Sequence, residues 1–110
     1  MRQNSEQRRV KRDYEDKYMS IVKKTVLEVL KDRSCQVFLF GSRARGTFRL
    51  GSDMDVGVSG LDEDFFSRMK SRILLKVEES IVPFDVDIIN FDIVDGEFKK
   101  EARKNRIQWK

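Results

Sequence analysis

The sequence predicts one α/β domain, in which a small mixed β-sheet is packed against flanking helices. Segments with an apolar residue every three to four positions alternate along the chain with short runs of β-branched and aromatic residues. These are the patterns of amphipathic helices and of buried strands, respectively. The chain has 110 residues, 39% of them hydrophobic, which suffices for one thin two-layer core and leaves no room for a second.

The first half of the chain is predicted to hold one helix and two strands. Residues 14–31 place apolar residues near a period of 3.6, with Lys and Glu between them, as in an amphipathic helix. The run Val37–Phe40 is continuously apolar and ends at Gly41, which indicates a strand buried on both faces. Residues 54–58 follow a turn-rich loop and are expected to form the neighbouring strand.

The second half is predicted to alternate helix and strand twice more. Asp62 is a suitable N-cap for a helix that runs to about Glu79. Residues 84–91 alternate as a third strand, 96–105 can form a basic helix, and 107–109 can add a short final strand. The resulting order, α-β-β-α-β-α-β, favours a mixed sheet with helices against it.

Composition limits the chemistry that this chain can perform. It has no His and one Cys, Cys35, which excludes His-based catalysis, internal disulfides and the common zinc sites. No apolar run approaches the ~20 residues of a membrane span, so no membrane partner is expected. A lone thiol fits a reducing compartment, and we expect a cytoplasmic protein. The net charge of +4 favours anionic partners such as nucleotides, with nucleic acid as a less favoured alternative.

Both ends of the chain are basic, whereas the acidic residues gather in the middle. We therefore divide the chain into a basic extension, residues 1–13, and a single domain, residues 14–110. The extension is expected to be a frayed, solvated arm. Contact of this arm with nucleic acid or with a partner is the alternative.

Carboxylates alternate with apolar residues at the start of the second and third predicted strands. Asp53 and Asp55 share one strand face because side chains two residues apart point the same way, and Asp85 and Asp87 do so too. If the two strands are neighbours, one of the later pair joins the earlier pair. Three clustered carboxylates repel one another, and a hard cation, Mg²⁺ or Mn²⁺, would reverse that cost. Such a set suits two-metal phosphoryl transfer.

The turn after the first strand offers groups that bind phosphate. Gly41 lets the backbone approach a ligand closely, and Ser42 can both cap the next helical turn and donate its hydroxyl. Arg43, Arg45 and Arg49 place guanidinium groups near a phosphate-sized site, although loop arginines are more usually solvated. The turn is neither a Walker A loop nor a Gly-x-Gly-x-x-Gly dinucleotide fingerprint.

Taken together, these motifs resemble a known signature. Gly41-Ser42, ten intervening residues and then Asp53-x-Asp55 resemble the signature of the DNA polymerase β-type nucleotidyltransferase superfamily. The chain is most similar to its minimal members, the MNT proteins that pair with HEPN-domain partners in toxin–antitoxin modules. The likeness covers most of the chain, from Phe40-Gly-Ser-Arg-Ala-Arg-Gly through Phe84-Asp-Val-Asp-Ile-Ile to Ile107-Gln108-Trp109.

The resemblance implies a role for each motif. Gly41 and Ser42 match the nucleotide-phosphate turn, while Asp53 and Asp55 match the metal-binding pair. The resemblance, rather than strand geometry, selects Asp87 as the third carboxylate, which binds a metal and helps deprotonate the acceptor. It also implies a nucleotidyltransferase-like fold, two ions of Mg²⁺ or Mn²⁺, and ATP as the donor.

The function implied is transfer of a nucleotide, AMP from Mg-ATP, to a hydroxyl on a partner protein, as the antitoxin of a HEPN-type toxin. A chain of 110 residues has no room for a separate acceptor-binding domain, so the partner would complete the acceptor site. The alternative is a non-catalytic antitoxin or nucleotide-binding protein that neutralises its partner by binding alone. A weaker third reading is a nucleic-acid binder that uses the basic ends.

Overall fold

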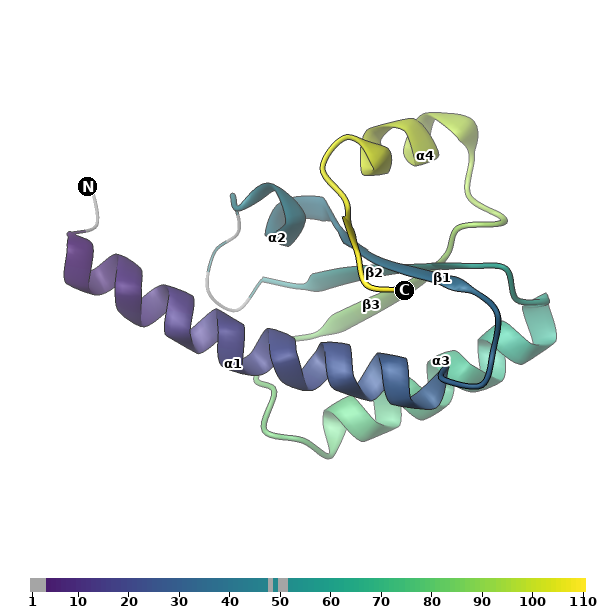
Figure 1. Cartoon of the computed structure of the whole chain (residues 1–110), viewed down its shortest axis with the longest axis horizontal. Helices are drawn as coiled ribbons and strands as arrows, with labels where there is room; N and C mark the ends of the chain where they lie inside the picture. Colours follow the sequence, from purple (N-terminus) through teal and green to yellow (C-terminus); the bar gives the residue numbers. More distant parts are fainter. Residues whose placement is uncertain (1–3, 48, 50–51) are drawn as a thin grey trace.

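The computed structural model (Figure 1) describes the backbone of residues 4–47, 49 and 52–110, and their side chains except those of residues 8–14. Helices and strands alternate much as the sequence predicts. In chain order the elements are α1 (Ser5–Val29), β1 (Gln36–Phe40), α2 (Gly41–Arg45), β2 (Met54–Ser59), α3 (Glu63–Glu78), β3 (Val86–Asn90), α4 (Gly96–Arg103) and β4 (Ile107–Gln108).

The strands form one mixed sheet in the order β3-β2-β1-β4. Strand β1 runs antiparallel to β2, with Phe40 opposite Asp55, and antiparallel to β4. Strands β2 and β3 are parallel, with Asp55 opposite Asp87. A parallel pair needs a long crossover connection, and α3 provides it. The predicted fold class, a small mixed sheet with flanking helices, is confirmed.

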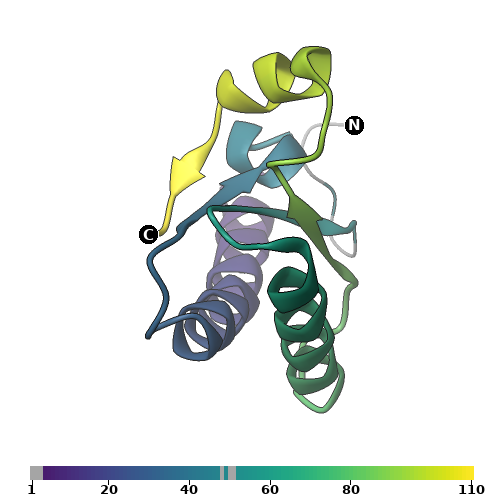
Figure 2. The same cartoon turned by 90° about the vertical axis from the view of Figure 1, so that its right-hand side faces the viewer.

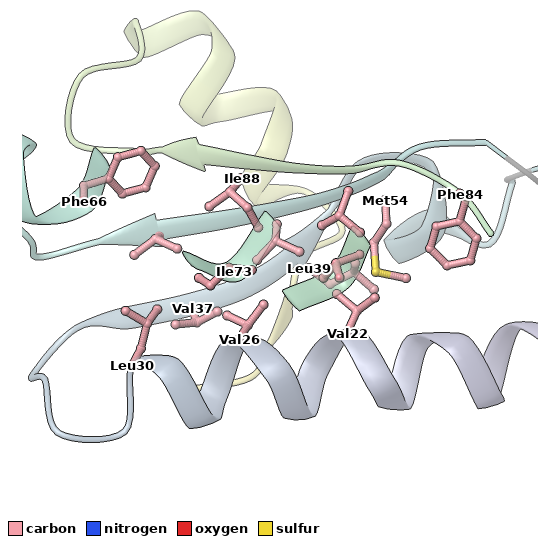
Figure 3. Close-up of a cluster of buried hydrophobic side chains, with 14 residues drawn as sticks. Val22, Val26, Leu30, Val37, Leu39, Met54, Phe66, Ile73, Phe84 and Ile88 are labelled. Atoms are coloured by element: carbon pink, nitrogen blue, oxygen red, sulfur yellow. The ribbon is translucent and has the colours of Figure 1, made fainter. Parts of the chain in front are cut away.

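Helices α1 and α3 cover one face of the sheet, as Figure 2 shows. Asp62 caps α3 by accepting a hydrogen bond from the Phe65 amide at 2.8 Å, as predicted. The main hydrophobic core fills the space between these helices and the sheet (Figure 3). Its most deeply buried side chains are Val22, Val26, Leu30, Val37, Leu39, Met54, Val56, Val58, Ile73 and Ile88.

Helix α4 lies on the opposite face (Figure 2), above a smaller aromatic cluster. Phe38, Phe40 and Phe91 are buried there, and Phe98 of α4 packs on the last two of them. Gly57 of β2 leaves space for this cluster, because a Cβ at that position would lie 2.4 Å from the ring of Phe38. The two faces of the sheet therefore carry separate cores.

The main departure from the predicted elements is at the N-terminus. Helix α1 begins at Ser5, nine residues before the expected start, so the prediction of a frayed arm is wrong for the backbone of residues 5–13. Asn4 and Gln7 form a capping box, in which each side chain accepts a hydrogen bond from the other residue's amide. These bonds satisfy amides that the first turn would otherwise leave without partners. In the described part of the chain, no helix is long and apolar enough to cross a membrane.

Candidate functional site

The turn between β1 and α2 is pressed against an acidic side chain. Gly41 has φ of +75°, a conformation that L-residues rarely adopt. A Cβ at Gly41 would lie 2.3 Å from Oδ2 of Asp55. Only a glycine therefore lets the chain leave β1 beside this carboxylate. The sequence analysis expected the backbone at Gly41 to approach a ligand closely. The group that it approaches in this structure is the carboxylate of Asp55.

Asp55 is the centre of a group of three interacting carboxylates. It lies opposite Phe40 on β1 and opposite Asp87 on β3, and directly paired residues point to the same face. Asp55 and Asp87 therefore emerge on the face that carries α4. Partial burial raises the pKa of Asp55, and the nearby charges of Asp87 and Asp53 raise it further, while Arg43 and Arg45 oppose the shift. Asp53 and Asp87 are themselves exposed.

The register distinguishes between the two candidates for the third carboxylate. Asp87 pairs with Asp55, whereas Asp85 lies before the first residue of β3 and contributes its backbone carbonyl to the amide of Met54 at 2.9 Å. Asp87 also raises the pKa of Asp55. The geometry thus favours Asp87 on grounds independent of any resemblance.

These carboxylates do not form a closed metal cage in the structure. Across the residues that are described, no group of three or more His, Cys, Asp or Glu side chains is arranged to hold a metal ion. The donor set nevertheless fits a hard divalent cation, because all of its ligands are carboxylate oxygens. Burial raises the pKa of Asp55, and repulsion from Asp87 and Asp53 raises it further. A bound cation would offset this repulsion.

Arg43 points into the protein rather than toward an anion. Its side chain is buried against Glu15 of α1, with Nε donating to Oε2 at 2.9 Å and Nη2 donating to Oε1 at 3.2 Å. Nη1 donates to the backbone carbonyls of Ser52 and Asp53, the latter at 2.7 Å. The guanidinium also lies over the ring of Phe84, 4.2 Å from its centroid.

These contacts differ from the phosphate contact predicted for Arg43. They tie the end of the loop that carries Asp53 to the long helix α1, so Arg43 acts as a positioning residue. Glu15, its partner, was not singled out by the sequence analysis. A signal was present: Glu15 lies seven residues before Val22 and eleven before Val26, on the stripe of α1 that faces the core.

The remaining predicted residues lie around the turn. Ser42 is half-buried, and its carbonyl accepts hydrogen bonds from the amides of Gly46 and Thr47. Arg45 is exposed and lines a pocket together with Gly41. Arg49 is exposed, and its carbonyl accepts hydrogen bonds from the amide and hydroxyl of Ser52.

Comparison with known sequences identifies relatives of this arrangement. The family model described as the nucleotidyltransferase domain matches residues 19–109. Over 93 residues the chain is 28% identical to the "Probable protein adenylyltransferase MntA" of Haemophilus influenzae, in an alignment that spans 84% of this chain and 78% of that protein.

Solved structures share the fold. A protein assigned as a minimal nucleotidyltransferase matches with a TM-score of 0.64 at 24% identity, over 83% of this chain and 92% of that one. A chain of a toxin–antitoxin complex with AMP-PNP gives 0.61 at 19% identity, over 80% and 72% of the two chains. A chain of the complex of tri-AMPylated Shewanella oneidensis HEPN toxin with MNT antitoxin gives 0.58 at 15%, over 83% and 71%.

The matched region of the family model contains the Gly-Ser turn, all three carboxylates and every strand of the sheet. The turn and the carboxylates are also the parts that the structure brings together, since Gly41 lies against Asp55 and Asp55 is paired with Asp87. The chain therefore belongs to the nucleotidyltransferase domain family.

Proposed function

We propose that this chain transfers AMP from Mg-ATP to a hydroxyl group of a partner protein, and that it is the antitoxin of a HEPN-type toxin. The observation that carries the proposal is the contact between the Gly41 turn and the Asp55 carboxylate, with Asp87 directly opposite. A phosphate held by the turn would then lie beside the acidic cluster. The relative from Haemophilus influenzae is named a protein adenylyltransferase, which supports the same reaction class.

The proposed partner rests on the relatives of known structure. One of the similar chains belongs to a toxin–antitoxin complex with AMP-PNP, and another to a complex that contains a tri-AMPylated HEPN toxin.

The site residues divide into metal ligands, a proton acceptor and phosphate-binding groups in the proposed reaction. Asp53, Asp55 and Asp87 would hold Mg²⁺ or Mn²⁺, which when bound supplies positive charge that stabilises the phosphoryl group in the transition state. Asp87 lies on the edge strand β3, where a hydroxyl from another chain can reach it, and it accepts the proton of that hydroxyl. Gly41 and Ser42 bind the phosphates, and Arg45 offsets their charge.

The bond changes follow from these positions. The acceptor oxygen forms a bond to the α-phosphorus as the bond from that phosphorus to the pyrophosphate oxygen breaks, and pyrophosphate leaves from the side of the Gly41 turn. The protein's contribution is to align the acceptor, the phosphorus and the leaving group and to stabilise the charge that develops.

Transfer of label from ATP carrying a labelled α-phosphate tests the proposal. The acceptor is a purified HEPN-type protein, and the variant is Asp53→Asn combined with Asp55→Asn. We expect label on the partner with the wild type and none with the variant. Asp85→Asn is the matched control, because Asp85 is exposed and lies outside the paired cluster, so this variant should transfer normally.

A different result would favour neutralisation by binding alone. In that case the partner would be silenced equally by the wild type and by the Asp53→Asn/Asp55→Asn variant, and no label would be transferred. Neither substitution removes an apolar contact surface, so a complex formed through such a surface would survive both.

A further inference from the structure

A small pocket adjoins the acidic cluster on the α4 face of the sheet. It is lined by Phe40, Gly41, Arg45, Phe98, Glu101 and Ala102, and its volume is about 170 Å³. Two of its lining residues belong to the surroundings of Asp55. Gly41 is in contact range of that carboxylate, and the charge of Arg45 lowers the pKa of Asp55. The pocket is therefore continuous with the site proposed for the phosphates.

The floor of the pocket is aromatic. Phe98 packs on Phe40 and Phe91, with ring centroids 5.8 and 5.7 Å apart, respectively. Phe98 nevertheless remains 40% exposed, whereas Phe40 and Phe91 are buried. A large apolar ring left open in a concave site is a platform on which a flat apolar group can stack.

We propose that this pocket binds the base of the donor nucleotide, with Phe98 as the stacking platform. This inference rests on the proposed function and names the part of the site that recognises the nucleoside. The volume suits one ring system, since it is smaller than the ~300–1,000 Å³ of sites that enclose a whole ligand of drug size. The carboxylate of Glu101, which also pairs with Lys104, is an acceptor on the rim for an exocyclic amino group such as that of adenine.

The position of the pocket favours the base over the acceptor side chain. The acceptor hydroxyl must reach Asp87 on β3, whereas the pocket is built on the end of β1 and on α4, with β2 between β1 and β3. An aromatic floor also disfavours the phosphates, which need donors and positive charge. The nucleoside is the remaining part of the donor that an apolar platform next to the Gly41 turn can hold.

Calorimetry with two ligands, Mg-ATP and magnesium tripolyphosphate, tests this inference on the whole chain. Tripolyphosphate offers the same phosphates without a base. We expect Phe98→Leu, which keeps apolar bulk but removes the ring, to weaken Mg-ATP binding by roughly tenfold or more and to leave tripolyphosphate binding unchanged. Phe98→Tyr keeps the ring and should bind Mg-ATP as the wild type does.

Phe65→Leu is the matched control, because it makes the same substitution on α3, beneath the opposite face of the sheet. It should change neither affinity. Thermal unfolding of each variant checks that α4 remains docked.

The inference is overturned if Phe98→Leu leaves Mg-ATP affinity unchanged or lowers both affinities equally. Unchanged ATP affinity with reduced transfer to the partner would place the acceptor side chain, rather than the base, in the pocket. Failure of the wild type itself to bind Mg-ATP would overturn the proposed function as well, so the two failures are distinguishable.

Discussion

Arg43 and Glu15 are 28 positions apart in the sequence, yet they form a buried ion pair in which both side chains are almost fully enclosed, at 0% and 3% exposure. Burying two charges is costly unless each is fully hydrogen-bonded. Here the guanidinium is shared between the carboxylate and the carbonyls of Ser52 and Asp53. The pair thus orders the start of the strand that bears the acidic cluster. Each charge depends on the other, because removal of either side chain would leave a buried charge without its counter-charge.

Removal of Glu15 should therefore be strongly destabilising. We expect Glu15→Ala to lower the free energy of unfolding by about 3–5 kcal/mol, because it removes the carboxylate that neutralises the buried Arg43 charge. Glu28→Ala on the same helix is the control. Glu28 pairs with Lys31 on the surface, and loss of such a pair costs about 1 kcal/mol or less. Urea unfolding of the two variants measures the difference, and equal losses would contradict the positioning role of Arg43.

Removal of the Asp55 charge should raise stability, whereas removal of Glu15 lowers it. Burial and the neighbouring carboxylates raise its pKa, so its ionised form is less favourable in the folded chain than in the unfolded chain. Asp55→Asn removes that repulsion, and in EDTA at neutral pH we expect it to raise the Tm by a few °C, since ~1 kcal/mol moves Tm by about 4–8 °C in a small domain.

The matched control for Asp55 is Asp85→Asn, which should leave the Tm in EDTA unchanged. Addition of Mg²⁺ should raise the Tm of the wild type more than that of Asp55→Asn, because only the wild type keeps the complete carboxylate set. A lower Tm for Asp55→Asn in EDTA would show that this carboxylate is structural rather than held in place for its chemistry.

At the scale of the elements, the junction of β1 and α2 couples backbone conformation to the position of the Asp55 side chain. Gly41 and Gly46 bound α2, and they have nearly equal positive φ angles of 75° and 78°. An added Cβ at Gly41 would strike Asp55, whereas among the described residues nothing lies within 4 Å of a Cβ at Gly46.

This pair of glycines separates backbone strain from displacement of the carboxylate. Both Gly→Ala substitutions should cost roughly 1 kcal/mol of stability through strain in the left-handed region. Only Gly41→Ala should abolish nucleotide transfer, because the new methyl group displaces the Asp55 side chain. Label transfer and thermal unfolding are the measurements. If Gly46→Ala also abolishes transfer without loss of stability, the cause is the altered backbone of the turn and not displacement of the Asp55 side chain.

The elements differ in how far the sequence predicts them. Strand β1 was predicted, because a continuous apolar run is a local pattern in the sequence. The start of α1 was not predicted, because residues 5–13 have no apolar stripe of helical period. The helix begins there with a capping box formed by Asn4 and Gln7. The alternation of side chains along a strand does not distinguish Asp85 from Asp87. The register of β3 against β2, which places Asp87 opposite Asp55, favours Asp87.

The parts of the site that depend on tertiary packing were not predictable in the same way. Arg43 was expected to bind phosphate, because the motif shows a positive charge beside a phosphate-sized site. The motif does not show that Arg43 pairs with Glu15, which is distant in the sequence. Phe98 was expected only as part of a basic helix. Its exposed ring becomes a feature of the site because α4 packs on the same face of the sheet as Asp55.

On the scale of the whole molecule, the long helix α1 joins the basic N-terminal segment to the core. Val22, Val26 and Leu30 anchor the C-terminal half of the helix in the core, and Glu15 extends the buried contacts toward the N-terminus. The family model begins at residue 19, so residues 5–13 continue the helix beyond the matched region. This segment could support the helix around Glu15, or it could contact a partner protein. The two roles predict different effects of its deletion on stability and on label transfer.

Deletion of residues 1–13 should give a folded, active chain of reduced stability. The deletion removes the capping box and leaves Glu15 in the first helical turn, so we expect the Tm to fall by several °C while label transfer to the partner persists. Asn4→Ala in the full chain is the control: it removes only the cap, at a cost of about 1 kcal/mol. If the deletion abolishes transfer while its Tm equals that of Asn4→Ala, the segment contacts the partner and is part of the functional unit. If the deleted chain fails to fold, the boundary at residue 13 is wrong and α1 is required in full.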